Sequence, residues 1–309
     1  MVRSAPRTVS NLSPRELALA DRLDLLSRNY TAAIAQHDPI RFAASYPRND
    51  DREVAAWIAS AFAYGRVDTI LATIGRLLGA LGSRPADAID RIGDFRRFAR
   101  EDLAGLRHRF HSARDAAALL YAIGRARSEA GSVRGFFERE QREEDGDVGG
   151  LLSRAVERIL AFDWRPVLGR RTLPEGSPVR FFFPSPASGS ACKRWNLYLR
   201  WMVRKDEMDF GLWKAIPTRR LVIPTDTHVH RVARRLGLTR RKAADWKTAR
   251  EITDRLARFD PEDPVRYDDA LCELGTAGIC RPSLAASLCG DCALVEACPA
   301  GRRRIRRAA

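Results

Sequence analysis

The sequence predicts an all-helical protein, and three observations lead to that prediction. Apolar residues recur at helical spacing, as in the set Val54, Trp57, Ile58 and Ala61. Segments with the strict alternation of a strand are scarce. Residues that favour the start or the end of a helix recur along the chain at distances that match typical helix lengths. A chain of 309 residues is long enough for about two domains, each with its own core.

The N-terminal half is expected to consist of successive helices. The first begins at Ser13, a good cap residue followed by proline at the first helical position, and it runs to His37. Further helices are expected over residues 51–63, 67–81, 85–92, 101–109, 113–130 and 149–162. Between them, residues 138–150 mix charge with glycine, which predicts an exposed loop.

A segment rich in Pro, Gly and Ser follows over residues 165–190 and contains the run Phe181 to Phe183. Such a run is more often a plug of the core than a base-stacking surface. A helix is then expected over residues 191–204 with Ser190 as its cap, which puts Lys193 in the first turn. A helix start binds phosphate and favours a neutral amine nearby, so Lys193 is either a functional amine or a solvated surface residue.

The segment from Leu221 to Leu238 predicts an extended apolar stretch followed by a helix that Asp226 caps. The apolar face of this helix is expected to be Val229, Val232, Ala233 and Leu236. Judged by itself, Asp226 is more often a structural cap than a catalytic carboxylate. Both interpretations stay open at this point.

Four cysteines near the C-terminus are separated by eight, two and five residues: Cys280, Cys289, Cys292 and Cys298. Four thiolates at such spacing suit either tetrahedral zinc or a [4Fe-4S] cluster. Disulfides are disfavoured because the N-terminal stretch has no apolar export signal, which indicates a reducing cytoplasm. The other two, Cys192 and Cys272, are expected to be small buried hydrophobes, with Cys272 as an alternative first ligand.

The chain is strongly basic, with 54 Lys and Arg against 39 Asp and Glu, a net charge of +15 and a pI near 10.3. This charge favours a polyanion such as nucleic acid as the partner. Only five of the basic residues are lysines, so each lysine is a candidate for a position where the chemistry requires an amine. No apolar stretch approaches membrane length, and a soluble protein is expected.

The run IPTDTHVHRVARRLGL, followed about 50 residues later by the four cysteines, resembles the helix-hairpin-helix DNA glycosylases of the endonuclease III type. The resemblance implies that Asp226 is the essential carboxylate and that Lys193 is the Schiff-base lysine. It also implies a [4Fe-4S] cluster on the four cysteines, in preference to zinc. The segments ACKRWNLYLRWMVRKDE and DPVRYDDAL are more closely similar to a bacterial family of unassigned function related to these enzymes.

The resemblance implies a two-domain helix-hairpin-helix fold around a DNA-binding cleft. The expected parts are residues 1–50, which pack with the cluster domain, a six-helix bundle over 51–220 with the hairpin near 184–204, and 221–309 with the catalytic Asp and the cluster. The residues expected to contact DNA are Gly189, Ser190 and Arg194 at the hairpin, Tyr64 and Arg66 as a wedge, and Arg281 beside the cluster. Gly189 is the single glycine of the hairpin, where endonuclease III has two.

The implied function is base excision repair: a monomeric cytoplasmic, nucleoid-associated DNA glycosylase with AP lyase activity on damaged duplex DNA. Three alternatives stay open. The chain is a monofunctional glycosylase, a catalytically silent DNA binder of the same fold, or a helical scaffold that four cysteines stabilise through zinc without any nucleic-acid role.

Overall fold

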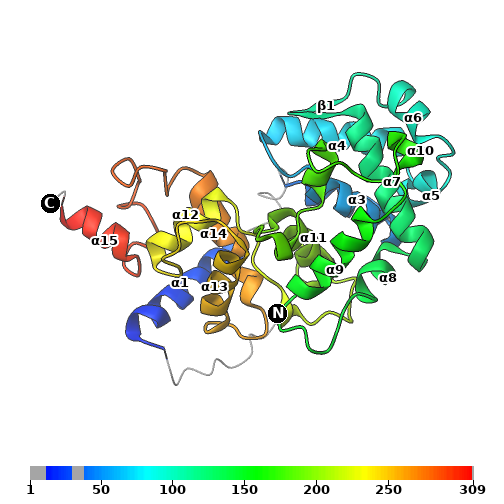
Figure 1. Cartoon of the computed structure of the whole chain (residues 1–309). Helices are drawn as coiled ribbons and strands as arrows, with labels where there is room; N and C mark the ends of the chain where they lie inside the picture. Colours follow the sequence, from blue (N-terminus) through cyan, green and yellow to red (C-terminus); the bar gives the residue numbers. More distant parts are fainter. Residues whose placement is uncertain (1–11, 30–37, 308–309) are drawn as a thin grey trace. The chain divides into compact units, whose positions relative to one another are not determined.

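The computed structural model describes residues 12–29 and 38–307. These are mostly helical, which confirms the predicted class, and the described strands form one two-stranded hairpin (Figure 1). The chain divides into two units. The first comprises Met1–Thr31, Gly189–Asn196 and Thr218–Ala309, and the second comprises Ala32–Ser188 and Leu197–Pro217. The segment around residues 184–204 is therefore shared between the two units.

The second unit contains helices that pack around α3, which is almost fully buried, and α7, which buries one face. Its helices are α2 (Ile40–Ala44), α3 (Asn49–Ala61), α4 (Val67–Leu81), α5 (Pro85–Asp90), α6 (Phe95–Glu101), α7 (Ala113–Ala130), α8 (Val133–Glu138), α9 (Gly149–Leu160) and α10 (Arg165–Leu168), with 3-10 turns η3 (Pro178–Phe182) and η4 (Pro186–Ser188). Asp51 to Ala61 of α3 are all buried or nearly so apart from Arg52. A helix that is buried almost all round belongs at the centre of a domain.

A buried carboxylate ties this core together. Glu53 on α3 is 4% exposed and accepts hydrogen bonds from Trp213 Nε1 at 3.0 Å and from the Arg134 backbone at 3.0 Å. Burial raises the pKa of Glu53, and these two donors lower it. The Tyr198 hydroxyl, on α11 (Lys193–Val203), donates to the Glu53 carbonyl. Because buried polar groups are costly unless paired, these bonds hold residues 197–217 against α3.

The predicted helix over residues 101–109 is wrong in its position. The helix α6 ends at Glu101, and the chain then forms a hairpin of β1 (Arg107–His108) and β2 (His111–Ser112). Arg109 at the tip has φ of 54°, which lets two residues close the turn. The buried histidines at 108 and 111 pair across the hairpin, and their rings bond inward rather than facing solvent.

The first unit is built around the pair α12 and α14. It contains α1 (Pro14–Asn29), α12 (Thr227–Leu236), α13 (Trp246–Ala257), α14 (Asp268–Thr276), α15 (Pro299–Arg306) and the 3-10 turns η5 (Thr218–Arg220) and η6 (Pro264–Tyr267). A Cβ added at Gly275 of α14 would lie 2.7 Å from His228 Cβ, so these two helices touch closely. The helix α1 packs on α14, and Arg15 donates to the Ala297 carbonyl at 3.1 Å.

Several predicted boundaries hold and others shift. The helix over 67–81 matches α4, whereas α1 ends at Asn29 and the rest of that prediction lies outside the described residues. The helix expected from residue 191 begins at Lys193, because Cys192 has φ of 49° and breaks the helical path. Phe182 and Phe183 are buried as predicted, but Phe181 is 39% exposed.

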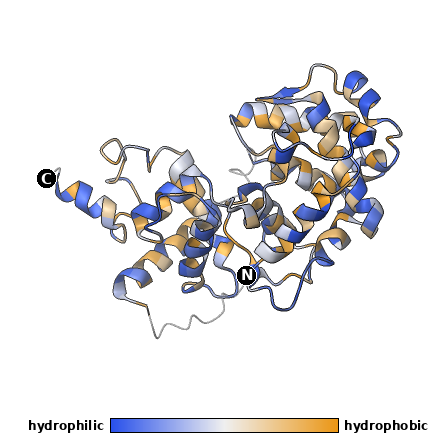
Figure 2. Cartoon of the chain, in the orientation of Figure 1, coloured by the Kyte–Doolittle hydropathy of each residue, from blue (hydrophilic) through white to orange (hydrophobic). Residues whose placement is uncertain are grey.

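Charge is divided unevenly between the units. The first has 26 Lys and Arg against 15 Asp and Glu, and the second has 28 against 24, so the first holds +11 of the net +15. Figure 2 shows α15, with its four arginines, as predominantly hydrophilic. Within residues 12–29 and 38–307, no helix is both long and apolar enough to cross a membrane.

Candidate functional site

Asp226 caps α12, as the structural interpretation of the sequence predicts. Its Oδ1 accepts from the backbone of His228 at 2.8 Å and of Val229 at 2.9 Å. The buried stretch of Leu221 to Ile223 precedes it, and the predicted apolar face of α12 is buried. Within the described part of the chain, Oδ2 of Asp226 makes no hydrogen bond. The half-buried carboxylate thus has one oxygen that its capping role does not use.

Lys193 is the first residue of α11, and the loop before it is docked onto α13. The Gly189 carbonyl accepts from Trp246 N at 3.0 Å, and Ser190 forms an antiparallel bridge with Asp245. Ser190 Oγ accepts from Cys192 N at 3.2 Å. Cys192 itself is 1% exposed, as predicted, and burial raises its pKa to about 12. These contacts hold the helix start, so the position of Lys193 is determined by its backbone.

The charges of Lys193 and Asp226 both act on the Cys272 thiol of α14. Burial raises the pKa of the Cys272 thiol well above its usual range. The negative charges of Asp268, Asp226 and Asp269 raise it further, while the positive charge of Lys193 lowers it. The charges that act on this one thiol therefore come from the starts of three helices, α11, α12 and α14. We call Lys193, Asp226 and Cys272 the convergent site.

The convergent site contains two groups that could act as a nucleophile, the Cys272 thiol and the Lys193 amine. A thiol with a raised pKa stays protonated near neutral pH and reacts slowly, so Cys272 is a poor nucleophile. Lys193 lies at the start of an eleven-residue helix, where exposed backbone N–H groups favour a bound anion. The arrangement suits an amine that attacks an electrophilic carbon beside a carboxylate.

The four closing cysteines lie in the loop between α14 and α15, residues 280–298, which we call the cysteine loop. Burial raises the pKa of Cys292, and Cys298, Cys280 and Cys289 raise it further. Cys298 and Cys280 likewise raise the pKa of Cys289 beyond the effect of burial. The four thiols are thus close enough to act on one another, whereas Cys272 belongs to the convergent site.

Nitrogen donors reach three of the four sulfur atoms of the cysteine loop. Arg235 Nη1 on α12 donates to Cys280 Sγ at 3.0 Å, and Gly301 N donates to Cys298 Sγ at 3.3 Å. The Leu294 backbone donates to Cys292 and lowers its pKa. Such donors stabilise anionic sulfur and are typical of thiolates that ligate a metal or cluster.

The four cysteines fit a four-thiolate centre, because their sulfur atoms are suitable ligands and N–H groups lie beside them. Among the residues that the structure describes, no three His, Cys, Asp or Glu side chains are drawn together at metal-holding distances. The six cysteines are all free thiols. The [4Fe-4S] cluster, and zinc as its alternative, stay predictions, with Cys280, Cys289, Cys292 and Cys298 as the residues that would hold either.

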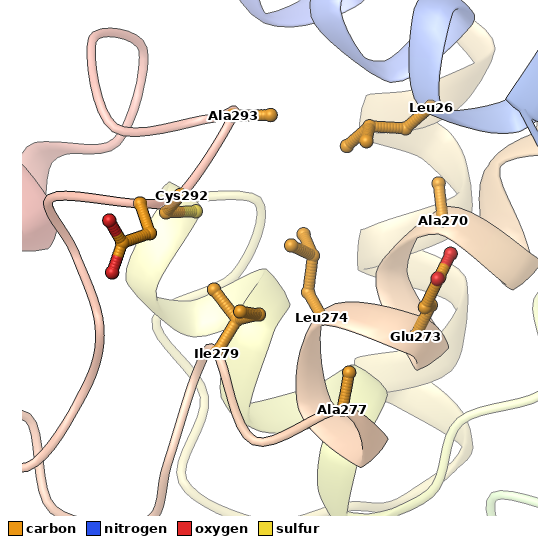
Figure 3. Close-up of a pocket in the computed structure, with 9 residues that line it drawn as sticks. Leu26, Ala270, Glu273, Leu274, Ala277, Ile279, Cys292 and Ala293 are labelled. Carbon is orange, nitrogen blue, oxygen red and sulfur yellow. The ribbon is translucent and has the colours of Figure 1, made fainter.

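Two surface pockets flank the cysteine loop. One, of about 190 Å³, has Cys292 and Ala293 on one side and Leu26, Ala270 and Leu274 on the other (Figure 3). The second has Cys289, Leu288 and Ile305 in its lining. Neither Lys193 nor Asp226 lines either pocket. The first pocket is smaller than the roughly 300–1,000 Å³ that is typical of ligand sites.

The residues predicted to contact DNA are divided between the two units. Gly189, Ser190 and Arg194 belong to the first unit near Lys193, and Arg281 is an exposed residue of the cysteine loop whose Nε donates to the Gly278 carbonyl. The predicted wedge, Tyr64 and Arg66, belongs to the second unit.

Over residues 38–277 the chain matches the family model described as "Protein of unknown function (DUF2400)". The chain belongs to the DUF2400 family. The match includes Lys193, Asp226 and Cys272 and ends three residues before Cys280. Searches of curated proteins and of solved structures found no match.

Membership in DUF2400 corrects the resemblance to the helix-hairpin-helix glycosylases, which was wrong: the matching family is a distinct one. The local structure gives a physical reason. A helix-hairpin-helix needs a helix directly before its turn, but between Leu168 and Lys193 the chain contains only the 3-10 turns η3 and η4. Gly189 and Ser190 bond to α13 instead of forming that turn.

Sequence reasoning missed Cys272 as a member of the convergent site, and it missed Asp268 and Asp269, whose charges act on the Cys272 thiol. The stretch DPVRYDDAL that contains the two aspartates was noticed only for its similarity to other sequences. The sequence did contain a useful signal, because all of these residues lie just before a helix or within its first two turns. Reactive residue types near the starts of different helices are candidates for one shared site.

Proposed function

We propose that this protein is a DNA base-excision enzyme, a glycosylase with AP lyase activity, whose nucleophile is Lys193. The observation that supports it best is the convergent site. The charges of an amine and a carboxylate both act on the same half-buried thiol, in the unit that holds most of the positive charge. Amines form imines with the aldehyde of an abasic sugar, and basic surfaces attract nucleic acid.

In the proposed reaction the neutral amine of Lys193 attacks C1′ of the damaged nucleoside. The bond from C1′ to the base breaks, and the base leaves with the bonding electrons and takes up a proton. Asp226, through Oδ2, accepts the proton that Nζ releases and stabilises positive charge on the sugar. Arginine cannot replace the lysine, since a guanidinium stays protonated.

Opening of the sugar ring then gives an imine between Nζ and C1′. Loss of a proton from C2′ expels the 3′ phosphate and cuts the strand, and water hydrolyses the imine to return the free amine. The backbone N–H groups at the start of α11 are suited to hold a phosphate beside the reacting sugar. The target base must leave the stack first, which costs least for damaged or mismatched bases.

In the same proposal the cysteine loop has a structural part. A [4Fe-4S] cluster, when bound, would cross-link residues 280–298 rather than take part in the chemistry. Arg281 and the arginines of α15 lie in or next to this loop, where they are suited to contact the phosphate backbone.

The test is borohydride trapping on a labelled duplex with a single abasic site. We expect the purified chain to give a covalent complex that survives denaturing electrophoresis, because reduction fixes the imine. Lys193→Ala and Lys193→Arg should both lose it. Lys247→Ala is the matched control, since Lys247 is an exposed lysine on α13 of the same unit.

Two outcomes would overturn the proposal. Trapping that persists unchanged in Lys193→Ala rules out this lysine as the nucleophile. Tight duplex binding without any trapped complex or base release would favour a catalytically silent DNA binder. A zinc scaffold predicts neither binding nor the brown colour with absorption near ~400 nm that an iron-sulfur cluster gives.

A further inference from the structure

Three aromatic rings gather at the surface of the second unit. Tyr64 follows α3, Phe110 is at the tip of the hairpin and Phe181 is in η3. The ring centres of Phe110 and Phe181 are 5.0 Å apart, those of Tyr64 and Phe181 4.9 Å, and those of Tyr64 and Phe110 6.2 Å. We call these three residues the aromatic platform.

The aromatic platform is open to solvent. Phe110 is 53% exposed and Phe181 is 39% exposed, and they are the only Phe or Trp side chains among the large exposed hydrophobic residues of the described chain. Neighbouring Phe182 and Phe183 are buried, so the phenylalanine run does plug the core while its first member points outward. Large apolar side chains that are exposed next to one another often mark a binding surface.

Two buried histidines hold the platform rigidly. His108 Nε2 donates to the Tyr64 carbonyl at 2.8 Å, and its Nδ1 pairs with the Thr73 hydroxyl at 2.9 Å. His111 Nε2 donates to the Pro178 carbonyl at 2.9 Å, which leaves Nδ1 to accept from the Tyr64 hydroxyl. The histidine bonds thus connect the hairpin to the Tyr64 joint and to η3, so the rings lose little freedom when a partner binds.

Positive charge borders the rings. Arg66, Arg107 and Arg109 are exposed, and Asp68 is the single acidic residue in the two segments 64–68 and 107–111. Arg109 has the left-handed backbone that disfavours a non-glycine residue. Its side chain lies along Gly65, where an added Cβ would be 3.3 Å from Arg109 Cδ. The guanidinium is thereby kept beside the joint that carries Tyr64.

We propose that the aromatic platform binds single-stranded nucleic acid by stacking unpaired bases on Phe110 and Phe181, with Arg66, Arg107 and Arg109 binding the phosphates. Rigid aromatic rings inside a basic border are the elements by which proteins bind single strands without sequence preference. The rings attract any base because every base has a flat π face. This inference does not depend on the chemistry proposed for Lys193.

The test compares two fluorescein-labelled strands of equal length by fluorescence anisotropy. One is an oligonucleotide with all its bases, and the other has the same phosphates with abasic spacers throughout. We expect the purified chain to bind the strand with bases more tightly. Phe110→Ala and Phe181→Ala should each weaken that binding by about 5- to 150-fold, and should hardly change binding of the spacer strand.

Leu25→Ala is the matched control, because Leu25 is also 53% exposed but belongs to the first unit. Phe110→Leu keeps an apolar side chain and removes the flat ring, so it separates stacking from general hydrophobic contact. Equal binding of both strands by the unaltered chain would overturn the inference, as would unchanged binding in the two alanine variants. Trapping through Lys193 should be normal in all of them, which keeps the two proposals separately testable.

Discussion

Arg235 Nη1 lies 3.0 Å from Cys280 Sγ, so the last turn of α12 is bonded to the cysteine loop. The same side chain donates to Ser287 Oγ at 2.9 Å and to the Pro282 carbonyl at 2.8 Å. At its other end, α12 begins at the cap Asp226. A helix of ten residues, roughly 15 Å long, thus joins the cysteine loop to the convergent site.

Arg235→Ala should loosen the cysteine loop. Removing the donor to Cys280 leaves the sulfur without its charged neighbour, and outer partners of metal ligands typically contribute about 10- to 100-fold to metal retention. For the four-thiolate centre that the sequence predicts, we expect a matching loss of metal to a chelator, measured by metal content and by absorbance. Arg234→Ala, an exposed neighbour on the same helix, should leave retention unchanged. Equal loss in both variants would contradict a role for the Arg235 bonds.

Substitutions of Asp226 should separate its capping role from its proposed chemistry. Asp226→Ala removes the acceptor for two backbone donors and should lower the free energy of unfolding by about 1 kcal/mol. Asp226→Asn keeps an acceptor oxygen and should lower the free energy of unfolding by only a few tenths of the amount lost in Asp226→Ala. Both should abolish base release, because neither has a carboxylate. Urea unfolding and a base-release assay check the two effects, and an active Asp226→Asn variant would show that the residue is only a cap.

Gly275 is expected to tolerate no side chain. In Gly275→Ala the new Cβ would lie 2.7 Å from His228 Cβ, an atom that cannot rotate away, so α12 and α14 must separate. Overpacking of this kind costs about 1–3 kcal/mol. The control is Gly79→Ala in α4, where nothing lies within 4 Å of the added Cβ and the substitution should stabilise by up to about 1 kcal/mol. Thermal unfolding of both variants should therefore shift in opposite directions.

Acid should weaken the support of the loop that precedes Lys193. The Arg241 guanidinium, with the backbone and side chain of Thr248, holds the pKa of Asp245 at about 2. This value is below the unfolded value of about 3.9. The carboxylate therefore stabilises the fold at pH above about 4, and this contribution is lost as pH falls toward 2.

Asp245→Asn, which can still cap α13, should remove that part of the acid sensitivity. Urea unfolding of both proteins between pH 6 and pH 2 measures it. We expect the two stability curves to be furthest apart near neutral pH and to approach each other below about pH 3. Parallel curves over the whole range would mean that the Asp245 charge adds no stability.

Local features were predicted well from the sequence because their causes are local. The helix α4, the cap at Asp226 and the buried face of α12 follow from residue spacing and from capping chemistry within one turn. The start of α11 was misplaced by two residues, since nothing in the residue type of Cys192 announces a left-handed backbone. The hairpin at residues 107–112 was missed because its two strands have only two residues each.

The convergent site was predictable only in part. Lys193 and Asp226 were singled out by their residue types at helix starts, but Cys272 was taken for a small buried hydrophobe. The charges that act on it come from segments that are dozens of residues apart, and the packing of α12 on α14 joins two of these segments. Likewise, the exposure of Phe181 depends on the path of η3. Three consecutive phenylalanines do not indicate which of them faces solvent.

The packing of α1 on α14 has a consequence for the newly made chain. Leu19 and Leu23 of α1 are buried, yet α14 is synthesised about 240 residues after α1. At typical elongation rates this delay is on the order of 10–50 s. During that time the apolar side of α1 has no partner helix on the ribosome, so nascent chains should bind chaperones at their N-terminal segment until α14 emerges.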